Sequence, residues 1–175
     1  LVAATTIILV GCTTNNQKEK STEKQLKTGI QNVIEYKSNG KAVKDKSVLG
    51  DNVLIFSPKD DASDIQKKLD EIYNIQERNQ FGDERYAIAF MPGDYGKSLQ
   101  VNVGYYTQVL GLGVLPTDTN INKLWVDASW MNHNATCNFW RGAENFSINE
   151  YCMWANSQAV SLRRINSEDG IVLSD

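Results

Sequence analysis

Apolar and polar residues alternate in short runs along the middle of the chain. The run Tyr86 to Phe90 stops at Pro92-Gly93, where proline removes an amide donor and glycine accepts turn conformations. Two further runs follow at Leu99 to Val103, with alternation at every second residue, and at Gln108 to Gly113. Short strands joined by tight turns, with no helix between them, indicate stacked strands rather than a βαβ sheet. The pattern predicts an all-β solenoid that opens as a right-handed parallel β-helix.

Strand-like runs recur after Gly113, at Lys123 to Val126, Cys137 to Trp140, Asn145 to Ile148, Val160 to Ile165 and Ile171 to Leu173. Upstream, the run Asn52 to Phe56 predicts one more strand. No capping element follows the last run, and a solenoid needs a cap at each end. We therefore expect residues 29–175 to be the N-terminal capping region and first coils of a longer β-helix.

One helix is expected, over Asp64 to Asn79. Ser63 and Gln66 match the spacing of a capping box. Apolar residues at helical spacing form a single stripe: Ile65, Leu69, Ile72 and Tyr73. An amphipathic helix just before the first coil can cover strand edges that would otherwise pair with other chains. We expect it to cap the open end of the solenoid.

The first twelve residues, LVAATTIILVGC, are apolar. They are too few to span a bilayer and are typical of the apolar part of a secretory signal. The ending resembles a bacterial lipobox, in which the cysteine, here Cys12, is lipidated and becomes the mature N-terminus. The alternative, a buried strand over residues 1–12, fits poorly with residues 13–28, a polar tether with little to pack. We expect a membrane-anchored lipoprotein on the bacterial cell surface.

Charge and motifs exclude several classes of function. The net charge is −3, so there is no basic footprint for nucleic acid. His133 is the single histidine, which argues against histidine-rich metal sites, and we expect no metal or cofactor. Gly111-Leu-Gly113 resembles part of a dinucleotide fingerprint, but Pro116 stands where the third glycine belongs and no helix opens there.

Aromatic residues are the most suggestive chemistry. Stacked coils can align side chains on one outer face, and flat rings beside polar groups suit pyranose sugars. Among the tryptophans, Trp130 and Trp140 have polar neighbours, and with Arg141 and Asp127 they are the candidate carbohydrate-binding residues. Trp125 lies among alternating apolar residues and is expected in the core. For each tryptophan, ordinary packing is the competing interpretation.

Glycoside hydrolysis needs two carboxylates at a set separation, and a lyase needs a base and charge neutralisation. Carboxylates that could serve are Asp127, Glu144, Glu150, Glu168 and Asp169. Sequence does not measure their separations, so the catalytic residues stay unassigned. Cys137 and Cys152 either form a disulfide, which an exported compartment permits, or are two buried free thiols.

From Asn52 onward several segments occur in order: NVLIFSP, ASDIQKKLDEIY, NQFGDERYAIAFMPGDY, VNVGYYTQVLGLG, NATCNFWRGAENFSI and ANSQAVSLRRI. Together they resemble a family of large secreted bacterial proteins with a pectate-lyase-like β-helix, often labelled "adenylyl cyclase" or "coagulation factor 5/8 type domain protein". The resemblance implies the β-helix and assigns no catalytic residue.

Two functions remain. The first is a cell-surface lipoprotein whose β-helix binds and cleaves an extracellular polysaccharide, as a glycoside hydrolase or polysaccharide lyase. The second is a non-catalytic surface module for adhesion or glycan capture, which a face of aromatic and polar residues also permits.

Overall fold

The computed structural model describes residues 49–174; Cys12, the predicted signal segment and the predicted tether lie outside them. Within this range nine strands form one sheet in which every pairing is parallel. The strands are β1 (Val53–Phe56), β2 (Tyr86–Phe90), β3 (Gly93–Asp94), β4 (Gln100–Asn102), β5 (Thr107–Gly111), β6 (Thr119–Val126), β7 (Arg141–Ala155), β8 (Val160–Ser167) and β9 (Ile171–Ser174).

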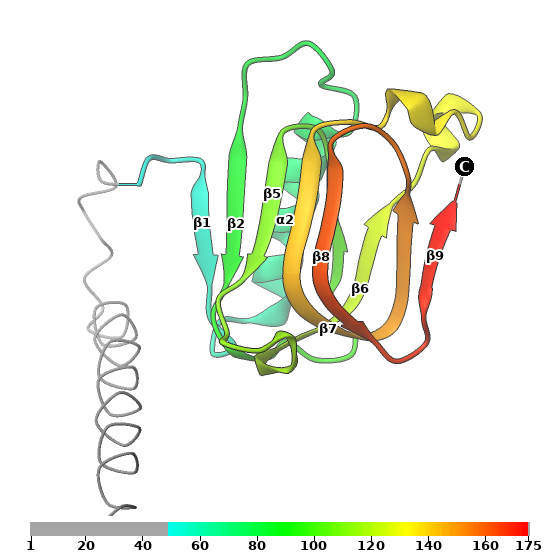
Figure 1. Ribbon diagram of the computed structural model, residues 1–175. Coiled ribbons are helices and arrows are strands. Elements are labelled where there is room, and N and C mark those ends of the chain that lie inside the picture. Colours follow the sequence, from blue (N-terminus) through cyan, green and yellow to red (C-terminus); the bar gives the residue numbers. More distant parts are fainter. Residues whose placement is uncertain (1–48, 175) are drawn as a thin grey trace, which may run out of the picture. The chain divides into compact units, whose positions relative to one another are not determined.

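The strands are arranged in three stacks, and β7 contributes to all of them (Figure 1). The first stack is β1-β2-β5-β7-β8, aligned at Ile55, Ala89, Leu110, Glu144 and Arg163. The second joins β3, β6, β7 and β8, aligned at Asp94, Asn120, Ser147 and Asn166. The third joins β4, β6, β7 and β9, aligned at Asn102, Trp125, Met153 and Val172. The chain therefore passes the same three positions repeatedly.

The bend between the first and second stacks requires unusual backbone. Asn145 in β7 and Arg164 in β8 have φ angles of 68° and 52°, in the left-handed region where asparagine is among the better tolerated residues. Asn145 Nδ2 donates to the carbonyl oxygens of Gly111 (2.8 Å) and Gly113 (2.7 Å). A Cβ on Gly111 would lie 2.0 Å from the Asn145 carbonyl oxygen. The bend thus needs a glycine in one coil and an asparagine in the next.

The interior is apolar and continuous across the coils. Phe90 packs edge-on against Tyr95 (5.0 Å between ring centroids) and Phe146 (5.7 Å). The strand predictions agree closely at Tyr86–Phe90, and in the third stack the last run falls within β9. The predicted strand Cys137 to Trp140 is wrong. A 3-10 turn, η3 (Ala135–Cys137), occupies its start, because the chain turns there to begin the next coil.

Helix α2 (Ala62–Gln76) begins differently from the capping-box prediction, which is wrong. Asp61 is the N-cap, and its Oδ1 accepts from the backbone amides of Ser63 (2.8 Å) and Asp64 (3.3 Å). Gln66 instead bonds the backbone of Gln100: its Nε2 donates to the carbonyl (3.0 Å), and its Oε1 accepts from the amide (2.9 Å). These two bonds satisfy backbone groups at β4, where a further strand would otherwise pair.

The apolar stripe of α2 faces the core. Ile65, Leu69 and Ile72 are each at most 4% exposed and belong to the core cluster, whereas Tyr73 is half-buried. The expectation that this stripe faces the core is confirmed. Within residues 49–174, none of the helices combines the length and hydrophobicity required to cross a membrane.

Replacing Leu69 by Ala should lower the free energy of unfolding by about 2–5 kcal/mol, because it leaves a cavity between the helix and the sheet. Ile75→Ala is the matched control, since Ile75 lies on the same helix and is 49% exposed; its effect should stay within about 0.5 kcal/mol. Chemical denaturation measures both. Equal, small effects would mean that α2 does not seal the core.

Candidate functional site

The residues that precede the strands of the first stack share one position in successive coils. They are Arg85, Tyr106, Trp140 and Ala159, which come just before β2, β5, β7 and β8. Tyr106, Trp140 and Ala159 have φ angles of 51°, 53° and 52°. The Tyr106 amide donates to the Trp140 carbonyl (2.7 Å), and the Arg141 amide donates to the Ala159 carbonyl (3.2 Å). The repeating turn therefore aligns these residues as a column.

Aromatic side chains form a ladder along this column. The Arg85 guanidinium lies 3.5 Å from the centroid of the Tyr106 ring, a cation–π contact. The rings of Tyr106 and Trp140 follow at 5.4 Å with a tilt of 48°. Trp140 is 55% exposed, so about half of its surface is open to solvent. We call Tyr106 and Trp140 the corner platform.

The backbone conformation makes this platform costly. A left-handed φ costs an ordinary L-residue about 1–2 kcal/mol, and glycine or asparagine tolerates it far better. Tyr106 and Trp140 occupy such positions, although ring contacts return only about 0.5–1.5 kcal/mol. Strained residues of this kind concentrate at functional sites. These two positions are therefore candidates for a functional role, in addition to the structural hydrogen bond that the Tyr106 hydroxyl donates to the Gln80 carbonyl (2.7 Å).

A depression of about 250 Å³ adjoins the platform, lined by Tyr106, Thr107, Gln108, Trp140, Arg141, Ala159 and Ser161. Gly142 lies in register with Gln108 and Ser161 on the outer face of the first stack. A Cβ on Gly142 would come within 2.6 Å of both Gln108 Oε1 and Ser161 Oγ. Glycine at this position leaves room for the two polar side chains to converge beside the rings.

Trp130 belongs to a second row of rings. The ring centroids of Trp130 and the buried Tyr105 are 6.5 Å apart. The Arg78 guanidinium lies 5.5 Å from the centroid of the Trp130 ring. Phe139 links the rows, with centroids 5.3 Å from Tyr105 and 5.4 Å from Trp140. Trp130 is half-buried. The two predicted groove tryptophans thus belong to one aromatic cluster, but only Trp140 is exposed.

Arg141, predicted to bind carbohydrate, is one of the residues that line the depression beside the corner platform. Only 5% of Arg141 is exposed. Its Nη1 donates to the Val103 carbonyl (2.7 Å), and its guanidinium lies 4.4 Å from the Tyr105 centroid. Burial lowers the pKa of Arg141 to about 10, which leaves it charged at neutral pH. As the first residue of β7, Arg141 points inward and packs against the Tyr105 ring of the aromatic cluster.

Asp127 and Trp125 differ from the predictions. Asp127 Oδ2 accepts from Trp125 Nε1 (3.1 Å) and Ser129 Oγ (3.1 Å). Asp127 therefore fixes Trp125, and no contact of its side chain joins it to the corner platform. Trp125 is half-buried and lies between Leu124 and Val126, both in the core. Because neighbouring strand residues point to opposite faces, Trp125 points outward, and its placement in the core is wrong.

Two of the remaining predicted carboxylates form ion pairs. Glu144 pairs with Arg163 (2.5 Å) and Glu150 with Lys123 (3.1 Å). His133 lies in an exposed turn. Among the described residues no group of histidine, cysteine, aspartate and glutamate could hold a metal ion. Cys137 and Cys152 are free thiols, so the disulfide alternative is wrong; burial raises the pKa of Cys152 to about 12.

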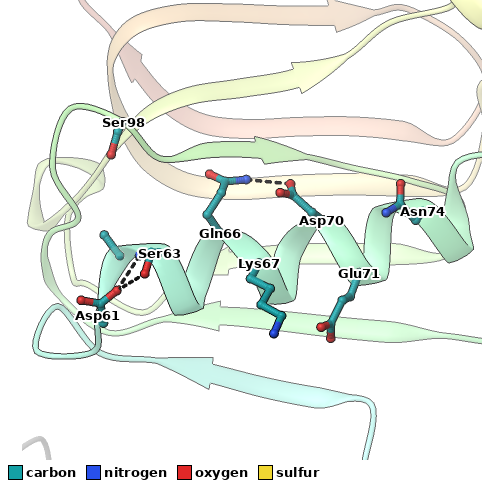
Figure 2. A pocket seen from close by; sticks show the side chains of 9 residues that line it. Asp61, Ser63, Gln66, Lys67, Asp70, Glu71, Asn74 and Ser98 are labelled. Atoms are coloured by element: carbon teal, nitrogen blue, oxygen red, sulfur yellow. Dashed lines mark hydrogen bonds between the residues drawn. The ribbon is translucent and has the colours of Figure 1, made fainter.

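A second concavity, of about 820 Å³, lies along α2. Figure 2 shows two hydrogen-bonded pairs among its polar side chains, Gln66 with Asp70 and Asp61 with Ser63. Asp61 caps the helix, and Glu71 pairs with Lys68 (2.9 Å). These groups stabilise the helix, and no set of them converges on one point in the hollow.

Known proteins share this architecture. The chain is 46% identical over 130 residues to an exo-beta-1,3-glucanase of Streptomyces sp. (strain SirexAA-E / ActE), a match that covers 72% of the chain and 21% of that protein. The solved structure of sacteLam55A from Streptomyces sp. SirexAA-E superposes with a TM-score of 0.68 at 45% identity, over 72% of the chain and 23% of the solved chain. A variant of sacteLam55A in complex with glucose matches equally well. The chain thus spans about a fifth of these relatives, and no family model matches it.

Replacing Trp140 by Asn should leave the free energy of unfolding within about 1 kcal/mol of wild type. Asparagine lowers the free-energy cost of the left-handed backbone conformation. The ring contact that is lost contributes a free energy of similar magnitude. Trp154→Ala is the comparison, because Trp154 is 1% exposed and its loss should cost about 3–5 kcal/mol. Thermal and chemical unfolding measure both. A loss above about 2 kcal/mol for Trp140→Asn would assign the ring to the fold.

Proposed function

We propose that this chain is part of a glycoside hydrolase that acts on a polysaccharide of the β-1,3-glucan class. Support comes from the 46% identity to an exo-beta-1,3-glucanase and from the structural match to sacteLam55A. We propose also that residues 49–174 are coils of a right-handed parallel β-helix of the pectate-lyase-like kind. The three in-register parallel stacks and the capping helix support this proposal.

In this proposal the corner platform binds the sugar. A pyranose ring has an apolar face that stacks on an aromatic ring, while its hydroxyl groups need hydrogen-bond partners at the edge. Trp140 offers an exposed indole, and Gln108 and Ser161 converge beside it over Gly142. The observation that carries the proposal is this exposed ring pair, held at strained backbone positions above a polar depression.

In this proposal the described residues contribute to recognition of the sugar, and acid–base chemistry is assigned to none of them. Glycosidases place two carboxyl groups about 5–9.5 Å apart across the scissile bond. Glu144 and Glu150 are each engaged with a basic side chain, Arg163 and Lys123. This observation also favours the second candidate function, a glycan-binding module without catalysis of its own. Both candidates use the same platform.

Binding of a soluble β-1,3-linked glucohexaose tests the platform. Trp140→Asn and Tyr106→Asn should each weaken binding about 2- to 12-fold, since each removes a stacking contact of about 0.5–1.5 kcal/mol. Gly142→Ala should weaken it as well, because its Cβ displaces Gln108 and Ser161. Phe81→Ser is the matched control, since Phe81 is 90% exposed and lies outside the platform. Calorimetry measures affinity; equal affinities for all variants would contradict the proposal.

We propose in addition that Cys12 is lipidated and anchors the protein on the outer side of the membrane. The apolar residues before Cys12 and the polar residues after it support this. In cells given labelled palmitate, wild type should incorporate the label and fractionate with membranes. Cys12→Ser should do neither, and labelling of the Ser variant would contradict the anchor.

A further inference from the structure

The third stack presents an outer face that the corner platform does not use. In β4, β6 and β7 the residues Val101, Leu124, Val126, Cys152 and Trp154 point into the core. Strand residues alternate between faces, so the residues between them point outward: Gln100, Asn102, Lys123, Trp125, Tyr151 and Met153. Register places Asn102, Trp125 and Met153 side by side in successive coils. We call these six residues the outer face of the third stack.

Two aromatic rings lie together on this face. The centroids of Trp125 and Tyr151 are 5.5 Å apart, and the planes are tilted by 42°. Trp125 Nε1 donates to Asp127 Oδ2 (3.1 Å), and Ser129 Oγ donates to the same oxygen (3.1 Å). The indole therefore has a defined orientation before any ligand binds, which reduces the entropy that binding would cost. Both rings remain partly exposed.

The charged groups at this face are bonded to neighbouring side chains. Lys123 Nζ lies 3.1 Å from Glu150 Oε2, and Asp127 accepts two hydrogen bonds from neutral donors. Gln100 Nε2 donates to Asn102 Oδ1 (2.8 Å), so the two side-chain amides of this face are bonded to each other. The face thus combines a tilted ring pair with amide groups and one ion pair, and Asp127 beside Trp125 adds a negative charge.

We propose that Trp125 and Tyr151 form a second glycan-binding surface, which takes a neutral β-linked glucan chain. An anionic polymer would need unpaired cations, and Lys123 is engaged with Glu150. A protein partner would favour a continuous apolar centre, whereas amides and an ion pair interrupt this one. Neutral hydroxylated sugars match both the rings and the amides. This surface goes beyond the proposed function, because it lies on another stack and would hold polymer independently of the corner platform.

The three methionines of the chain provide a local readout in the unmodified protein. Met153 lies on this outer face, Met131 follows Trp130 in the 3-10 turn η2 (Ser129–Met131), and Met91 is 7% exposed. With ¹³C-methyl-labelled methionine, β-1,3-linked glucohexaose should shift the Met153 signal saturably and leave Met91 unchanged. An unchanged Met153 signal up to millimolar sugar overturns the inference.

Variants then separate the two surfaces. Tyr151→Ala should weaken the Met153 titration about 2- to 12-fold, whereas Tyr151→Phe, which keeps the ring, should match wild type. Trp140→Asn should leave the Met153 titration unchanged even where it weakens calorimetric binding. If the Met153 titration follows Trp140 and ignores Tyr151, this second surface is wrong and the corner platform stands. If Tyr151→Ala fails to fold, the Met153 titration of wild type decides alone.

Discussion

In-register pairing of parallel strands is the constraint on which the rest of this structure depends. Successive strands of the first stack follow the same path, so residues at the same register position lie in a column. At the turn before the first stack the backbone conformation is left-handed for Tyr106, Trp140 and Ala159. The side chain at this position points outward and lies next to the side chain at the same position before the neighbouring strand. The platform is thus a direct consequence of the repeat.

The same constraint explains how the stack ends. A parallel sheet leaves backbone donors and acceptors free at its first coil, and its interior is open there. Helix α2 covers the open interior with its buried residues Ile65, Leu69 and Ile72. The side-chain amide of Gln66 bonds the backbone of Gln100. A glutamine side chain has one donor group and one acceptor, so it reproduces the two bonds of a missing strand residue.

Local pattern was enough to predict much of the fold. Strand β2 was predicted at its observed bounds, and the buried stripe of α2 followed from helical spacing. The wrong prediction for Trp125 concerns which face of a strand points into the core. Alternation of apolar and polar residues reveals a strand but does not determine its inward face. Trp125 points outward because Leu124 and Val126 fill the core. Arg141 points inward, beside Tyr105. Tyr106 was missed because only the three-dimensional repeat aligns it with Trp140; its signal was an aromatic residue directly before a strand.

The central claim is that strained corner positions display Tyr106 and Trp140 to a sugar. A crystal structure of the chain with a β-1,3-linked glucan oligosaccharide tests it most directly. The account predicts a pyranose ring stacked on the Trp140 indole, with hydroxyl groups within hydrogen-bond distance of Gln108 and Ser161. Ordered sugar elsewhere, with Trp140 uncovered and its depression holding only solvent, would contradict it.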